Sequence, residues 1–175
     1  MFKTIAIVFG VLIAALLAYA ASRPDSFRIE RTARIEAPAS EVFPLIVDLH
    51  KWREWSPYEK KDPAMRRHFR GPASGEGAIY EWEGDENVGV GRMEIVEAAE
   101  PSRVRIRLDF FRPFEAHNTA DFVLQEQGGA TQVTWAMYGP SPFMAKLMQV
   151  FFSMDGMVGP DFEAGLANLK AMAER

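Results

Sequence analysis

The stretch Arg103–Phe110, RVRIRLDF, alternates apolar and charged side chains without a break. Successive side chains of an extended strand point to opposite sides, so its four apolar residues would share one face and its charged residues the other. One face of this strand is predicted to be covered and the other to be wet. That pattern is typical of an antiparallel sheet with a single buried face.

The same period of two recurs along the chain. In YEWE, Tyr80 and Trp82 fall on one face while Glu81 and Glu83 fall on the other, and in the first strand Arg31 is a charged exception among apolar positions. Gly, Pro and charged turns separate these segments. We predict seven strands, at residues 27–37, 65–71, 77–84, 89–98, 103–111, 116–127 and 131–138.

Helical spacing appears in two places. Ser40 is the predicted N-cap of a short helix that has Pro44 near its start. After residue 140 apolar residues recur every three or four positions, with a predicted break or kink near Gly159-Pro160. The order of elements predicts an α+β fold with a long C-terminal helix on one face of a curved sheet. Because one helix cannot fill the concave side of such a sheet, a cavity is expected between them.

The N-terminus carries an apolar run of 18 residues without a charge, from Thr4 to Ala21. At about 1.5 Å per residue this run would extend roughly 27 Å, close to the thickness of a hydrocarbon core. We therefore predict a single-pass membrane anchor at residues 1–22, a linker at 23–26 and one domain at 27–175. A cleaved signal peptide, with secretion to the periplasm or beyond, is the alternative. The charges that flank this run do not decide on which side of the membrane the domain lies. In a bacterium, the membrane would be the inner one.

Composition excludes several kinds of site. The net charge of −4 provides no positive field for nucleic acid, and the absence of cysteine excludes thiolate nucleophiles, disulfides and Cys-based zinc sites. The three histidines, His50, His68 and His117, are widely spaced, and we predict no metal site and no cofactor.

Six segments together carry a resemblance to a known family: IEAPASEVFPLIVDLHKWREWSPYEKKDP, GPASGEGAIYEWEG, VGVGRMEIVE, RPFEAHNTADFVL, TQVTWAMYGP and FEAGLANLKAMAE. The chain resembles the polyketide cyclase/dehydrase-like branch of the SRPBCC, or START-like, superfamily over residues 27–174. The resemblance implies the helix-grip fold, with a curved antiparallel sheet around a long C-terminal helix and an apolar cavity between them. It also implies a hydrophobic ligand such as a lipid, sterol or polyketide, with catalysis in only some branches. It transfers no catalytic residue.

Strand phase and helical spacing select the candidate ligand-binding residues. For any one of them, ordinary core packing competes with ligand contact. Asn118 shares a face with apolar residues and is expected to be buried, with either a structural hydrogen bond or a ligand contact. The full set is Tyr80, Trp82, Met93, Leu108, Phe110, Asn118, Phe122, Trp135, Met137, Phe143, Met157 and Phe162.

The sequence therefore favours a membrane-tethered protein that binds a hydrophobic small molecule in its cavity. Two alternatives remain. One is a metal-free cyclase or isomerase acting on a polyketide-like or steroid-like substrate, which requires a titratable group with a shifted pKa in the cavity. The other is a protein-interaction module that uses the groove under the helix.

Overall fold

Seven antiparallel strands form one sheet in the computed structural model, which describes residues 2–175. Their spatial order is β1-β7-β6-β5-β4-β3-β2, so consecutive hairpins build β2 to β7 and β1 closes onto β7. All seven predicted strands are present, with ends shifted by one or two residues. Their bounds are β1 Ser26–Ile35, β2 Arg66–Arg70, β3 Ile79–Glu83, β4 Val90–Ala99, β5 Arg103–Arg112, β6 Ala116–Gln127 and β7 Ala130–Pro140.

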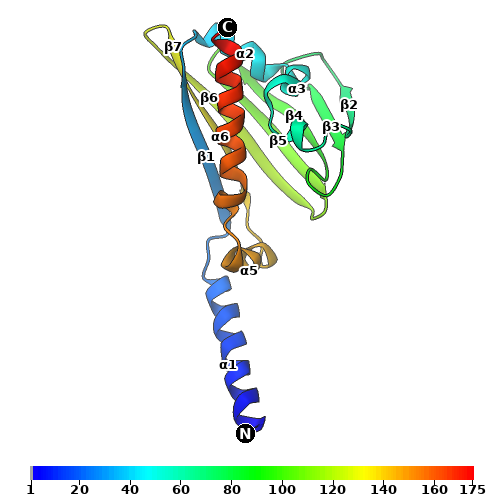
Figure 1. Cartoon of the computed structure of the whole chain (residues 1–175), viewed down its shortest axis with the longest axis vertical. Helices are drawn as coiled ribbons and strands as arrows, with labels where there is room; N and C mark the ends of the chain where they lie inside the picture. The colour runs from blue at the N-terminus through cyan, green and yellow to red at the C-terminus, as the bar shows by residue number, and fades with distance from the viewer. Residues whose placement is uncertain (1) are drawn as a thin grey trace.

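The helices lie at the two ends of the chain and between β1 and β2. Figure 1 shows α6 running along β1, with α2 and α3 near its C-terminal end and with α5 and α1 at the opposite end. This is the α+β arrangement that the order of elements predicts and the helix-grip fold that the family resemblance implies. The helices are α1 Phe2–Ala21, α2 Ala39–Val47, the 3₁₀ turn η1 Leu49–Lys51, α3 Trp52–Trp55, α4 Tyr58–Lys61, α5 Phe143–Phe151 and α6 Met154–Ala173.

Strand β5 shows why the alternation predicts the sheet correctly. Val104 and Ile106 are fully buried on its inner face. On the outer face, Arg105 pairs with Glu97 at 2.8 Å and Arg107 pairs with Glu94 at 2.6 Å. Cross-strand pairs of opposite charge favour this register and leave the wet face well solvated.

Two helix boundaries differ from prediction. Helix α2 begins at Ala39 and not after Ser40, and it continues through Pro44, which lies in its second turn. The C-terminal helical segment breaks at Phe152 and Ser153, where the Ser153 hydroxyl accepts a hydrogen bond from the Gly156 amide at 3.1 Å. Of the break or kink predicted near Gly159-Pro160, the break is wrong: α6 continues through Pro160, because packing of α6 against the sheet outweighs the hydrogen bond that proline lacks.

Arg31 has a structural partner for each side of its guanidinium group. It lies on β1 beneath α6, where it donates to Asp155 at 2.8 Å and to Glu163 at 2.7 Å. The hydrogen bond to Asp155, followed by that to Glu163, raises the pKa of Arg31 above its ordinary value. Gly159 leaves the space that this side chain uses, since a Cβ there would lie 2.1 Å from Arg31 Nη2. The charged exception in the strand pattern thus joins β1 to α6.

Helix α1 projects from the domain (Figure 1). It is long and apolar enough to cross a membrane, and almost all of its surface is exposed. A signal sequence near an N-terminus has the same properties.

Candidate functional site

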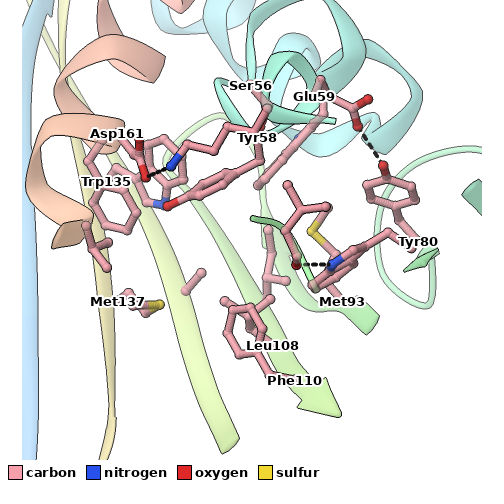
Figure 2. Close-up of a pocket in the computed structure, with 18 of the residues that line it drawn as sticks. Ser56, Tyr58, Glu59, Tyr80, Met93, Leu108, Phe110, Trp135, Met137 and Asp161 are labelled. Carbon is pink, nitrogen blue, oxygen red and sulfur yellow. Dashed lines mark hydrogen bonds and ion pairs between the residues drawn. The ribbon is translucent and has the colours of Figure 1, made fainter. Parts of the chain in front are cut away.

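A cavity of about 310 Å³ lies between the concave face of the sheet, α6 and the α3–α4 segment. Figure 2 shows side chains from the sheet and from both helical segments pointing into this space. The structure brings together most of the residues predicted from strand phase and helical spacing. Those that line the cavity are Tyr80, Trp82, Met93, Leu108, Phe110, Trp135, Met137, Met157 and Phe162.

Three of the predicted residues lie outside this lining. Phe122 is fully buried and packs edge-on against Trp52, with ring centroids 5.7 Å apart, so it belongs to the core. Phe143 begins α5 and is 47% exposed. Asn118 is half-buried and not buried as expected, and its Oδ1 packs against Gly139 on the neighbouring strand. Strand phase selects the face of Asn118 but not its position along the strand relative to the cavity.

Sequence reasoning missed the polar residues of the cavity. Ser56, Tyr58, Glu59 and Lys61 come from the α3–α4 segment, and Asp161 comes from α6. The α3–α4 segment has no regular period, and its short helices receive their orientation from tertiary packing. Only the combination of aromatic, acidic and basic residues in SPYEKK distinguishes it, and that combination is equally common in surface loops.

Glu59 is a buried carboxylate at the cavity wall. Tyr80 donates its hydroxyl to Glu59 Oε1 at 2.6 Å, as Figure 2 shows, and Arg67 donates Nε to Glu59 Oε2 at 2.7 Å. The Glu59 and Arg67 side chains are only 6% and 13% exposed. Because a buried charge needs a counter-charge and hydrogen bonds, these three residues form one interdependent unit.

The pKa shifts of this unit describe its protonation state. Burial, followed by the hydrogen bond to Glu59, raises the pKa of Tyr80 far above its ordinary value, so the hydroxyl stays protonated and donates. Burial lowers the pKa of Arg67, but the hydrogen bond and negative charge of Glu59 outweigh that effect and the net pKa is raised. The unit therefore presents a neutral phenol in front of an ion pair.

A second polar group joins α4 to α6 across the cavity. Lys61 Nζ donates to Asp161 Oδ2 at 2.6 Å (Figure 2), and the same ammonium lies 5.2 Å from the centre of the Tyr58 ring. Burial, followed by the negative charge of Asp161, raises the pKa of Tyr58 well above its ordinary value. Tyr58 is thus a second neutral phenol in the cavity lining.

Stacked aromatic rings form the wall between the cavity and the core. Trp135 stacks on Phe162 with ring centroids 4.0 Å apart and an angle of 9° between the ring planes, which fixes α6 on β7. Trp52 and Trp55 are buried in this wall and donate their indole N–H groups to the carbonyl oxygens of Ile46 and Leu45. Their function is packing, with Trp52 also lining the cavity.

The cavity reaches the surface at the end of the domain near α5. Met157, which is 59% exposed, and Asn87, on the exposed β3–β4 loop, both line it. Trp82 lies just inside, where it donates to the Val88 carbonyl at 3.0 Å and meets Phe110 edge-on. The mostly apolar lining suits a hydrophobic small molecule.

Within residues 2–175, no group of three or more His, Asp or Glu side chains is placed to hold a metal ion. The titratable groups at the cavity instead form the two hydrogen-bonded clusters around Glu59 and Asp161. Their chemistry is hydrogen bonding, because the raised pKa values of Tyr58 and Tyr80 keep both phenols neutral.

Comparisons with solved structures place the fold among known proteins. The aromatase/cyclase Zhui from Streptomyces sp. R1128 is similar with a TM-score of 0.61 and 16% identity, over 86% of this chain and 94% of that one. Protein MLL2253 from Mesorhizobium loti gives 0.60 and 14%, over 85% and 98%. Protein CV1439 from Chromobacterium violaceum gives 0.59 and 13%, over 87% and 99%. At these low sequence identities, the TM-scores show a shared fold.

A search of curated proteins returns no match. The model of one family, described as polyketide cyclase / dehydrase and lipid transport, matches residues 26–174. That match begins at β1, ends just after α6 and takes in every residue of the cavity. The chain is a member of the polyketide cyclase/dehydrase and lipid transport family.

Proposed function

We propose that this protein is tethered to a membrane by α1 and binds a hydrophobic small molecule, lipidic or polyketide-like, in the cavity under α6. The observation that carries the proposal is the cavity itself, with a volume of about 310 Å³ and a lining of mostly apolar side chains. Small-molecule sites combine such a lining with a few placed polar groups. The family description, which includes lipid transport, agrees with this class of ligand.

The polar groups suggest how the ligand would be oriented. Because Tyr80 already donates its single proton to Glu59, its oxygen would accept a hydrogen bond from a ligand hydroxyl, while the aliphatic part of the ligand would lie against Leu108, Met137 and Phe162. Trp135 Nε1 is buried at the same wall and, among residues 2–175, has no hydrogen-bond partner. An acceptor on the ligand would satisfy it after a small rearrangement of the wall.

The test is native mass spectrometry of the full chain in nanodiscs, with extraction and identification of the bound molecule. Ala120 is 5% exposed and lines the cavity, so A120F would fill the space that the ligand needs. Ala164, exposed on α6, provides the matched control A164F. We expect a stoichiometric ligand in the parent and in A164F and its loss in A120F. A domain that stays empty after exposure to membrane lipid extract, or a ligand that A120F retains, would refute binding in this cavity.

A metal-free cyclase or isomerase is the second candidate, and the Glu59–Tyr80–Arg67 unit favours it. Tyr80 lies between the Glu59 carboxylate and the cavity, so its oxygen would take a proton from a bound substrate as its own proton passes to Glu59. The variant Y80F separates the two functions. An enzyme would lose turnover of the identified ligand while retaining much of its binding, and a carrier would show no turnover in either form.

A further inference from the structure

Helix α5 exposes an apolar face and buries its charge. Its only charged residue, Lys146, is 7% exposed and pairs with Asp25. Met144, Met148 and Phe151 follow the spacing i, i+4 and i+7, which places them along one side of the helix, and they are 66%, 44% and 66% exposed. A surface helix in water normally has the opposite arrangement, with charges outward.

The apolar surface continues beyond the helix. Phe152 directly follows α5 and is 59% exposed. The β5–β6 hairpin adds Phe111, near the end of β5, and Phe114, in the turn, which are 49% and 68% exposed, and Figure 1 shows this hairpin at the same end of the domain as α5. A cluster of large exposed apolar side chains at one end of a domain marks an interaction site.

The position of α5 relative to α1 indicates which surroundings cover it. Helix α1 packs its C-terminal end against α5. Within α1, Ala20 is buried and Leu16 is half-buried, whereas its other described residues are exposed. Leu16 lies five residues before the end of the helix, or about 7.5 Å along its axis. If α1 spans the bilayer, α5 lies within about 7.5 Å of the end of the span. Amphipathic helices lie in the interface at a depth of about 5–10 Å, so the two depths agree.

We propose that the α5 surface, formed by Phe143, Met144, Met148, Phe151 and Phe152, lies in the boundary between headgroups and acyl chains of the bilayer that α1 crosses. The inference rests on the membrane tether of the proposed function. It adds a second contact with the bilayer, which fixes the orientation of the domain. Met157, at the start of α6, is both exposed and part of the cavity lining, so this orientation turns the opening of the cavity toward the lipid.

The absence of cysteine allows a direct test on the full chain, because a single introduced cysteine can be spin-labelled. The labels are M148C on the α5 surface, V11C in the middle of α1 and A167C on the exposed side of α6 toward its C-terminal end. After reconstitution into phosphatidylcholine vesicles, electron paramagnetic resonance compares collisions with oxygen, which concentrates in lipid, and with a water-soluble nickel chelate. We expect an oxygen-to-nickel ratio several-fold higher for M148C than for A167C, and higher still for V11C.

Each other outcome has one meaning. A ratio for M148C equal to that for A167C, with V11C in lipid, would overturn the interfacial position of α5 and leave the tether intact. Low collision rates with both reagents at M148C would mean that protein, such as a second copy of the chain, covers α5, and would also overturn the inference. An oxygen-to-nickel ratio for V11C as low as that of a residue in water would refute the tether and the inference together. Ligand binding in the cavity is decided separately by mass spectrometry.

Discussion

Replacing Arg67 by methionine tests whether the Glu59 unit is a buried, interdependent cluster. The substitution keeps an apolar side chain of similar length but leaves the Glu59 carboxylate, 6% exposed, with only the Tyr80 hydroxyl as a partner. It also removes the hydrogen bond from Arg67 to the Met65 carbonyl, at 2.6 Å. Removing one partner of a buried ion pair typically costs about 3–5 kcal/mol. We expect R67M to lower the free energy of unfolding by that amount.

The adjacent residue supplies a matched control. Arg66 lies on the same strand and pairs with Glu83 at 2.5 Å, but these side chains are 69% and 43% exposed. Exposed pairs contribute about 0–1 kcal/mol, so R66M should change stability little. The assay is urea unfolding of the full chain in nanodiscs, followed by fluorescence of the tryptophans that surround the cavity.

Two results would refute this reasoning. Equal losses in R67M and R66M would mean that burial does not decide the strength of the Glu59 pair. An E59Q/R67M double variant that is no more stable than R67M would also contradict it. The double variant E59Q/R67M should be more stable than R67M alone, since it removes the unpaired charge.

Three further outcomes follow from contacts elsewhere in the molecule. The hydrogen bond to Asp109 raises the pKa of His117, so an NMR titration should give a His117 pKa above the usual 6.5, and the D109N substitution should lower it. The stability that this contact adds is complete below pH 6.5 and is lost as the pH rises through the raised pKa of His117. G159A should change stability by less than about 1 kcal/mol in thermal unfolding, because the Arg31 guanidinium is the end of a flexible side chain that can move and alanine favours the helix, and a loss above about 3 kcal/mol would show that Arg31 is held rigidly. F122A should cost about 3–5 kcal/mol in the urea assay, because Phe122 is fully buried in the core, and a loss below about 1 kcal/mol would show that the site can collapse.

Prediction of the cavity from sequence succeeded where a regular strand faces it. In β3 and β5 the period of two places Tyr80, Trp82, Leu108 and Phe110 on the inner face, and all four line the cavity. It failed for Asn118, which is on the correct face but outside the cavity. Periodicity specifies the direction of a side chain, whereas position along a curved sheet depends on where the covering helices end.

The local order of the residues determined the seven strands, the α+β class and an N-terminal helix long enough to span a bilayer, because strand alternation and an uncharged run are local properties of the chain. Tertiary structure decided the rest. Glu59 meets Tyr80 and Arg67 only because α4 folds over β2 and β3, and Arg31 meets Asp155 across 124 positions of sequence. A buried charge depends on partners that come from distant segments, and no local pattern records which segments will meet.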